Sequence, residues 1–305
     1  MRTLILLAAM LAFGTSACAR RVTEEDLFHP RQVVLRDEPD HGRSVEVRRD
    51  GGVTLTGWML SATERAESDR AAAVDTPVPT LVYFCGNAET VADSMPRLTW
   101  LRDELRVNVM AFDYRGYGAS DGTPGLKTCG EDAVAVIAGL RAMKGHEQAP
   151  VIVYGRSIGG GMAVYAAAHA RIDGLVLEAP PASCPEVISA WNPNLPWYIR
   201  WCVTLEPDPA LADPSLQPIT MIPRVLCPLL IMHGGLDTVI PQAQGRELYE
   251  HAGSANKRFL ALPENGHNDL RLDRPLITEA LGRFVAQVVQ QIQLRGVLVP
   301  ETVKP

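Results

Sequence analysis

The sequence has no run of basic residues and only a modest share of charged ones. Lys and Arg number 29 against 35 Asp and Glu, the formal net charge is −6, and charged residues make up 21% of the chain. Proteins that bind nucleic acid need clustered Lys and Arg to neutralise phosphates. Because no such cluster is present, we expect no nucleic-acid partner.

The apolar run near the N-terminus is too short to cross a bilayer. Leu4–Phe13 spans about ten residues, whereas a bilayer core needs roughly twenty. Arg2 precedes this run and the small residues of Gly14–Cys18 follow it, which is typical of an export signal. The sequence therefore predicts a signal peptide over residues 1–19 rather than a membrane-spanning segment.

Cys18 follows the small residues Ser16 and Ala17, a pattern that resembles a bacterial lipoprotein signal. On that interpretation Cys18 becomes the lipidated first residue of the mature chain, and the protein lies in the cell envelope, anchored by lipid to a membrane surface. Ordinary secretory cleavage after Ala19 also fits the small-x-small rule, and it predicts a secreted or periplasmic soluble protein. Thr15 stands where lipoprotein signals usually have Leu, so both alternatives remain open.

Cysteines are few, six in all, and none is spaced like a zinc ligand. The sequence thus gives no reason to expect a metal. In an oxidising compartment Cys184 and Cys202 are close enough in sequence to form a disulfide within one segment. The alternative is that the cysteines are buried, unpaired thiols.

The length of 305 residues is consistent with one domain that carries an insertion. Residues 20–30 are charged and irregular and are predicted to form a tether. The domain itself is expected over residues 31–298, followed by a tail at 299–305. Near its start, alternating apolar residues on both sides of Asp50-Gly51-Gly52 predict an antiparallel hairpin.

From Thr80 onward, short continuously apolar segments alternate with helical stretches. This is typical of a parallel sheet that is buried on both faces. The predicted strands are Leu81–Phe84, Val107–Phe112, Val151–Tyr154, Leu175–Leu177, Leu229–Met232 and Phe259–Leu262, and the clearest helices are Glu131–Met143, Ile158–Ala170 and Leu276–Ile292. The predicted fold class is α/β, with a mostly parallel, doubly wound sheet.

Residues 180–228 interrupt this alternation and hold 11 of the 23 prolines. Because proline breaks helices, long straight helices are excluded here. An insertion between two core strands is predicted to form a small cap over the carboxyl edge of the sheet. Its tryptophans Trp191, Trp197 and Trp201 are candidates for an apolar substrate-binding wall, with inward core packing as the alternative.

The strongest motif is Gly155-Arg156-Ser157-Ile158-Gly159, a G-x-S-x-G between a predicted strand and a predicted helix. Strand, motif and helix in this order are what a nucleophile elbow requires, since the glycines permit the tight turn that raises the serine hydroxyl above the sheet. Ser157 is therefore the predicted nucleophile. The competing interpretation is a serine that merely caps the helix.

A serine nucleophile needs a base and a carboxylate that orients it. In this chain Asp237 and His267 each follow a predicted core strand, in the order Ser, Asp, His that the elbow predicts. They are the predicted acid and general base. Asp213 and Asp273 are the alternative acids, although neither follows a core strand.

Two backbone N–H groups must stabilise the oxyanion of an acyl-transfer intermediate. Ile158, directly after the nucleophile, supplies one candidate amide. The second is expected from the loop after Leu81–Phe84, where we favour the amide of Asn87 over that of Ala88.

These residues resemble the Bem46-type group of α/β-hydrolases, which adjoins the serine aminopeptidase S33 set. Phe84–Ala88 is similar to the group's F-H-G-N-A oxyanion loop, with Cys85 in place of the histidine, and Asp113–Ser120 is similar to its D-Y-R-G-Y-G-x-S segment. Gly266–Asp269 resembles its histidine loop. The resemblance covers residues 80 to 292, and it implies an α/β-hydrolase fold with the same catalytic triad.

Three functions remain open from the sequence. The first is hydrolysis of a small acyl ester or thioester through an acyl-enzyme, which requires no cofactor. The second is an aminopeptidase-like activity, for which Glu178, Glu206 or Asp208 would have to bind a free amine. The third is a non-catalytic binding lipoprotein of the envelope, which the complete set of catalytic residues disfavours.

Overall fold

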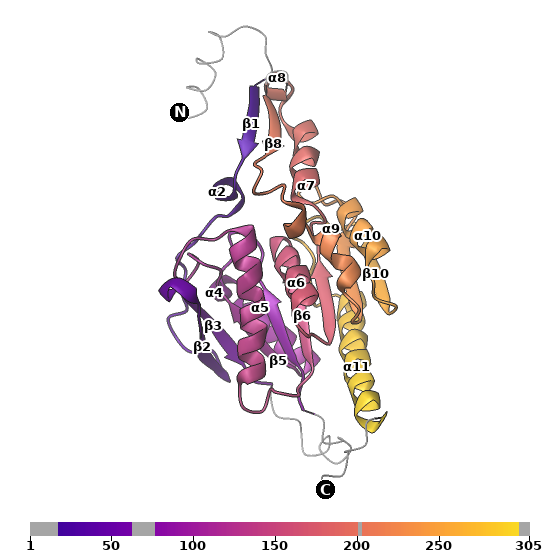
Figure 1. Cartoon of the computed structure of the whole chain (residues 1–305). Helices are drawn as coiled ribbons and strands as arrows, with labels where there is room; N and C mark the ends of the chain where they lie inside the picture. The colour runs from indigo at the N-terminus through magenta and orange to yellow at the C-terminus, as the bar shows by residue number, and fades with distance from the viewer. Residues whose placement is uncertain (1–17, 63–76, 201–202, 299–305) are drawn as a thin grey trace.

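A sheet of eight strands runs through the centre of the molecule (Figure 1). The structure is a computed structural model that describes residues 18–62, 77–200 and 203–298. In spatial order the strands are β10 (Lys257–Leu262), β9 (Leu229–Gly234), β7 (Gly174–Glu178), β6 (Val151–Arg156), β4 (Thr80–Phe84), β5 (Asn108–Phe112), β3 (Thr54–Leu60) and β2 (Gly42–Arg48). The six strands from β10 to β5 pair in parallel, and β3 pairs antiparallel with both β5 and β2. This arrangement confirms the predicted doubly wound sheet and its N-terminal hairpin.

The central strands are buried along their whole length. Every residue of β4, β7 and β9 is buried, as is every residue of β6 except Arg156. Parallel strands covered on both faces are continuously apolar, which is why the sequence locates them to within two residues.

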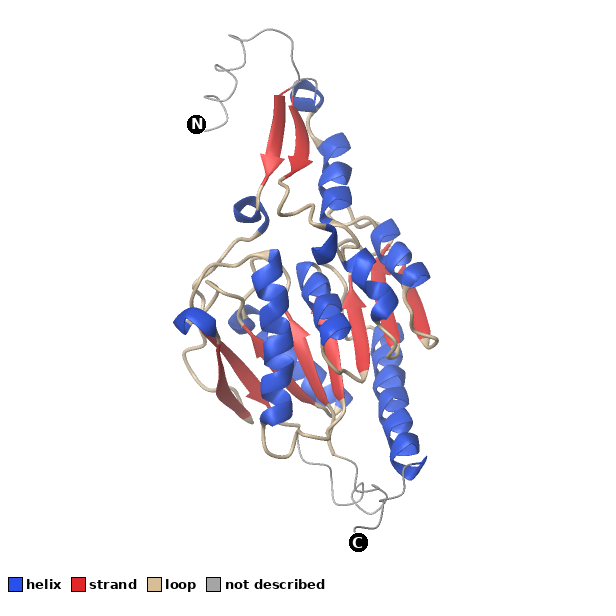
Figure 2. Cartoon of the chain, viewed as in Figure 1, coloured by secondary structure: helices blue, strands red, loops and turns tan. Residues whose placement is uncertain are grey.

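Helices cover both faces of the sheet (Figure 2). The main ones are α4 (Val91–Leu105), α5 (Leu126–Ala142), α6 (Ile158–His169), α10 (Gln242–His251) and α11 (Pro275–Leu298). Helices α5 and α6 pack against each other, and α4 packs against α11. Because β4–α4–β5 and β5–α5–β6 cross the sheet in opposite directions, right-handed crossovers put α4 and α5 on opposite faces.

The insertion at residues 180–228, called the cap from here on, contains only short elements in the part that the structure describes. They are α7 (Cys184–Trp191), α8 (Trp197–Arg200), β8 (Val203–Pro207), α9 (Pro218–Met221) and three turns of 3₁₀ helix at Asn192–Asn194, Pro214–Leu216 and Ile222–Arg224. The prolines explain these lengths, since several stand at the first or second position of a helix.

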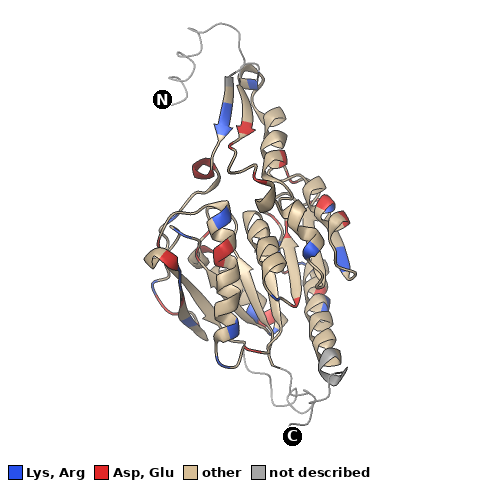
Figure 3. Cartoon of the chain, in the orientation of Figure 1, with Lys and Arg blue, Asp and Glu red and all other residues tan. Residues whose placement is uncertain are grey.

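Residues 18–29, called the N-terminal extension, are not the irregular tether expected from the sequence. They contain β1 (Cys18–Val22) and α2 (Glu24–Leu27), and Thr23 forms a capping box at the start of α2. β1 pairs in parallel with β8 of the cap, with Arg21 opposite Glu206, and Figure 3 shows the basic and the acidic strand side by side. The side chain of Phe28, only 3% exposed, joins the core.

The N-terminal extension is also attached to the central domain. Glu24 accepts a hydrogen bond from the amide of Leu126 at 2.7 Å. Leu126 is the first residue of α5, and the N-cap residue Gly125 has no side chain that could accept a hydrogen bond from the helix. The carboxylate of Glu24 therefore caps α5 in place of a local side chain.

Several expected features lie outside the described residues: the predicted signal peptide up to Ala17, the tail at 299–305, Trp201 and Cys202. Of the candidate disulfide pair, Cys184 is a free, buried thiol. No helix in the described ranges is long and apolar enough to cross a membrane.

Candidate active site

Ser157 stands at the sharp turn between β6 and α6. Its backbone has φ 53° and ψ −125°, a sparsely populated conformation for a residue with a side chain. The flanking glycines make this turn feasible, because a Cβ on Gly159 would lie 2.3 Å from the carbonyl oxygen of Phe84. A strained serine at the end of a central strand is the geometry that a nucleophile elbow requires.

The structure brings Ser157, His267 and Asp237 together. Nε2 of His267 lies 2.9 Å from Oγ of Ser157, and Nδ1 of the same ring lies 2.7 Å from Oδ2 of Asp237. Asp237 follows β9 and His267 follows β10, so both stand on loops at the carboxyl edge of the sheet. The three side chains form one hydrogen-bonded line from the carboxylate to the hydroxyl.

Asp237 is held in its ionised form. Burial alone would raise its pKa, but hydrogen bonds from His233, His267 and the amide of Ile240 outweigh burial and hold the pKa far below its usual range. Its Oδ1 accepts N–H groups from Val239 at 2.9 Å and Ile240 at 2.8 Å. An ionised carboxylate only accepts hydrogen bonds, so Nδ1 of His267 carries the proton and Nε2 is free to act as a base.

The two alternative acids lie elsewhere. Asp213 caps a 3₁₀ turn in the cap and accepts from Ser215, and Asp273 forms an exposed ion pair with Arg271 at 2.6 Å. Neither contacts His267.

His233, a residue that the sequence did not single out, lies against the same aspartate. Its ring is fully buried, with Nε2 2.9 Å from the carbonyl oxygen of Ile240 and 3.3 Å from Oδ2 of Asp237. A carbonyl only accepts, so Nε2 is the protonated nitrogen and points a positive dipole at the carboxylate. Its position in His233-Gly234-Gly235-Leu236-Asp237, at the end of β9, is the only sequence signal for this contact.

The loop after β4 contains the second oxyanion candidate. The amide of Ala88 donates to Oδ1 of Asn87 at 2.8 Å, and the amide of Gly86 donates to Oε2 of Glu89 at 2.9 Å. With those two amides engaged, the amide of Asn87 is the candidate that this loop leaves for an oxyanion. Ile158, the first residue of α6, directs its amide outward from the helix N-terminus.

The Asp113–Ser120 segment supports this oxyanion loop rather than reacting. The hydroxyl of Tyr114 donates to the carbonyl of Cys85 at 2.8 Å, and that of Tyr117 donates to Oδ1 of Asn87 at 3.1 Å. Asp113 accepts from the amide of Val91 at 2.7 Å, at the start of α4. Burial raises the pKa of the Cys85 thiol well above its usual value, so Cys85 is an inert packing residue.

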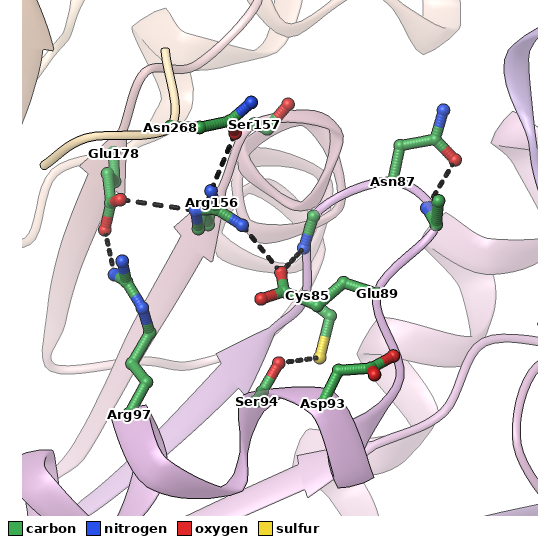
Figure 4. Close-up of polar contacts among 12 residues, drawn as sticks. Cys85, Asn87, Glu89, Asp93, Ser94, Arg97, Arg156, Ser157, Glu178 and Asn268 are labelled. Carbon is green, nitrogen blue, oxygen red and sulfur yellow. Dashed lines mark hydrogen bonds and ion pairs between the residues drawn. The ribbon is translucent and has the colours of Figure 1, made fainter. Parts of the chain in front are cut away.

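Arg156, the variable residue of the G-x-S-x-G motif, connects three loops behind Ser157 (Figure 4). Its Nη1 lies 2.8 Å from Glu89 of the loop after β4, and its Nη2 donates to Oδ1 of Asn268, next to His267, at 2.9 Å. Its Nε lies 3.3 Å from Oε1 of Glu178 at the end of β7. Motif matching does not reveal this role, because the partners come from three segments that are distant in sequence: two loops and the end of β7.

Glu178 is 1% exposed and is compensated from several sides. Arg97 lies 2.6 Å from Oε2, and the hydroxyl of Tyr154 donates to the same oxygen. Burial raises the pKa of Glu178, but the charges of Arg97 and Arg156 outweigh burial and leave its pKa below the usual value. Because the carboxylate of Glu178 is already paired with Arg97, Arg156 and Tyr154, it is not placed to bind a substrate amine.

A cavity of about 130 Å³ opens beside Ser157, and of the three predicted cap tryptophans Trp191 lines it. Trp197 does not; its side chain on α8 is 71% exposed. Trp201 lies outside the described residues. Of the two tryptophans that the structure describes, Trp191 therefore lies in the wall of this cavity, whereas Trp197 belongs neither to the cavity wall nor to the core.

A mostly parallel sheet, a strained serine between strand and helix, and an acid and a histidine that follow β9 and β10 define the α/β-hydrolase class. Comparison with known proteins agrees. The family model described as "Serine aminopeptidase, S33" matches residues 97–217.

Relatives in other organisms extend this match over most of the chain. Protein bem46 of Schizosaccharomyces pombe is 30% identical over 228 residues, which are 74% of this chain and 70% of bem46. The "Alpha/beta hydrolase domain-containing protein aho-3" of Caenorhabditis elegans is 29% identical over 295 residues, 94% of this chain and 80% of the other. This chain therefore belongs to the α/β-hydrolase family that includes bem46.

A solved structure shows the same fold. The esterase Pf2001 of Pyrococcus furiosus superposes with a TM-score of 0.67 at 18% identity, covering 86% of this chain and 98% of that one. At that identity the likeness shows the fold alone.

Proposed function

We propose that this protein is a serine hydrolase that cleaves carboxylic esters or thioesters of acyl groups through an acyl-enzyme on Ser157. Two contacts support this function above all. They are the 2.9 Å approach of His267 Nε2 to Ser157 Oγ and the 2.7 Å approach of His267 Nδ1 to Asp237.

The chemistry follows from these positions. As Oγ of Ser157 attacks the acyl carbon, Nε2 of His267 takes the hydroxyl proton, and Asp237 stabilises the resulting imidazolium. The amides of Asn87 and Ile158 would bind the oxyanion. The carbon–oxygen or carbon–sulfur bond then breaks, and the leaving group receives the proton from His267. A water molecule attacks the acyl-enzyme by the same route and releases the acid, with no cofactor involved.

The cavity favours an ester over a peptide with a free amine. None of the acids considered for an amine site lines it: Glu178 is buried behind the motif, and Glu206 and Asp208 stand at the end of β8 in the cap. The acid that does line it, Asp26, is paired with Arg20 at 2.7 Å. An aminopeptidase-like activity therefore lacks an uncompensated carboxylate at this site.

Fluorophosphonate labelling and hydrolysis of p-nitrophenyl esters test the proposal. Ser157→Ala should abolish labelling and lower turnover by a factor on the order of 10⁶, with folding retained. Ser215→Ala, at an exposed serine of the cap, is the matched control and should keep both activities. Labelling that persists in Ser157→Ala, or turnover of amino-acid p-nitroanilides without turnover of esters, would overturn the assignment.

Membrane attachment is a separate proposal: Cys18 carries lipid in a bacterial host. Cys18 is the first residue of β1, which begins at the end of the cap farthest from the central sheet (Figure 1). Mass spectrometry of the mature N-terminus distinguishes the alternatives. A diacylglyceryl group on Cys18 supports the anchor, whereas a peptide beginning at Arg20 favours simple secretion.

A further inference from the structure

The cavity beside Ser157 lies on the acyl side of the bond to be broken. The nucleophile and both oxyanion candidates, Asn87 and Ile158, are among its lining residues, whereas His267 is not. His267 must protonate the leaving group, so the leaving group has to lie next to that ring. A cavity lined by the oxyanion loops and not by the histidine is therefore placed to receive the acyl chain.

Helix α7 forms one wall of the cavity. Its lining residues Cys184, Val187, Ile188 and Trp191 follow the spacing of a single helical face. At 1.5 Å per residue, this apolar stripe is about 10 Å long. The indole N–H of Trp191 donates to the carbonyl of Val239 at 2.9 Å, which fixes the ring against the loop that carries Asp237.

The N-terminal extension contributes lining residues from outside the sheet domain. Leu27 and His29 line the same cavity, and both are tied to the oxyanion loop. The side-chain amide of Asn87 donates to the carbonyl of Leu27, and the backbone amide of His29 donates to Oδ1 of Asn87 at 3.2 Å and to the hydroxyl of Tyr117 at 2.8 Å. The extension is thus positioned by the very residues that position the oxyanion candidate.

We propose that α7 and the N-terminal extension together form an acyl subsite for neutral aliphatic chains of about four to six carbons. This rests on the proposed serine hydrolase function and adds the substrate class. The charged lining residue Asp26 is compensated by Arg20, so a neutral apolar chain fits better than a charged one. A volume of about 130 Å³ accommodates roughly four groups the size of water or methylene, at ~30 Å³ each.

A series of p-nitrophenyl esters from acetyl to decanoyl tests the subsite. In the unchanged protein kcat/KM should rise about fourfold per methylene from acetyl to about butanoyl or hexanoyl, then level off. Leu27→Trp should fill the cavity and remove this rise, and Leu27→Ala should move the optimum to longer chains. Leu27 is only partly buried, so both variants are expected to fold.

Two cap tryptophans provide a matched comparison. Trp191→Ala should flatten the chain-length profile, whereas Trp197→Ala, at an exposed ring outside the cavity, should leave it unchanged. Acetate esters of alcohols of rising length should show no comparable rise in any variant.

Fluorophosphonate labelling of Ser157 separates the two levels of failure. If every variant is labelled but the dependence of kcat/KM on acyl chain length is unchanged by the Leu27 and Trp191 substitutions, the proposed subsite is wrong and the serine hydrolase function still stands. A Leu27→Trp effect confined to the alcohol series would also overturn it. If the unchanged protein is not labelled at all, the proposed function fails first.

Discussion

Behind Ser157, buried charged groups connect the catalytic loops, whereas in front of it the cap and the N-terminal extension meet through mostly exposed side chains. Arg156 alone contacts the oxyanion loop, the end of β7 and the histidine loop. The strands β1 and β8, in contrast, form a separate two-stranded sheet. Val22 is buried in it, and the other side chains described in these strands are half-buried or exposed. A two-stranded sheet is marginally stable by itself.

This difference suits the two regions to two roles: the region behind Ser157 to the reaction itself, and the region in front of it to the choice of substrate. Loss of one partner from a buried charged network leaves another charge uncompensated, so the catalytic loops are fixed strongly. The extension is held by the buried side chain of Phe28 and by a few separate hydrogen bonds, such as those of Glu24 with Leu126 and of Asn87 with Leu27. We expect changes in the first region to alter the rate for every substrate, and changes in the second to alter which substrate is preferred.

Among the residues around Ser157, the largest effect is expected at the acid. Asp237→Asn should lower kcat by about 10⁴-fold for all esters, because the amide favours the wrong tautomer of His267. Asp273→Asn, in the exposed pair with Arg271, is the control and should retain full activity. If Asp273→Asn were instead the damaging change, the identity of the acid would have to be revised.

A pH effect on stability is expected next, at Asp113. Burial raises its pKa to about 6, above the value of about 3.9 in an unfolded chain. The stability that it contributes is therefore fully present below about pH 4 and is lost as the pH rises through 6. The loss is up to about 3 kcal/mol, or about 10²-fold in the unfolding constant.

Urea unfolding at pH 4 to 7.5 measures this loss. Asp113→Asn retains an acceptor for the amide of Val91 and should flatten the decline, whereas Asp121→Asn, at an exposed position, should keep it. Parallel pH curves for Asp113→Asn and the unchanged protein would contradict the assignment.

A smaller effect is expected at Arg156. Arg156→Gln should lower kcat about tenfold with little change in KM, because small displacements of the histidine and oxyanion loops are costly to rate. Arg271→Gln removes a surface ion pair close to the same histidine loop and is the control. A fall in thermal stability with unchanged kcat would show that the network serves folding alone.

The smallest effect is expected at Glu24. Glu24→Ala should loosen the N-terminal extension and raise KM about threefold for butanoyl esters, while acetyl turnover stays unchanged. Glu25→Ala, one residue along and exposed, should do neither. Equal effects on acetyl and butanoyl esters would show that the extension affects the rate for every substrate, as the loops behind Ser157 do, and would contradict the proposed contrast between the two regions.

Much of the sheet, and the meeting of Ser157, Asp237 and His267 at its carboxyl edge, could be predicted from the sequence. The central strands are continuously apolar because both faces of the sheet are covered, and this pattern can be recognised from one sequence without any alignment. Asp237 and His267 come directly after two such strands, so locating the strands also places these two residues at the carboxyl edge of the sheet. Helix α4 is less evident because Pro96 stands within it, and its start depends on the capping box at Thr90.

The remaining features depend on partners that are distant in sequence. Arg156 contacts Asn268 across more than a hundred positions, and β1 becomes a strand only because β8 provides its hydrogen bonds. Nothing local in residues 18–29 signals a strand, so a charged and irregular segment was the natural prediction. The same holds for Trp197, since sequence patterns do not distinguish an exposed aromatic residue in a proline-rich cap from a buried one.

The pairing of Cys18–Val22 with Val203–Pro207 also has a consequence for the order of folding. The first strand to be synthesised finds its partner only after most of the chain has followed, and contacts of such long sequence separation form slowly. Until then, the extension that carries Leu27 and His29 is held beside the nucleophile only by its contacts with Asn87, Tyr117 and the core. Newly made protein should therefore acquire a reactive Ser157 before it acquires its full chain-length preference, and the delay between the two would measure how fast β1 and β8 pair.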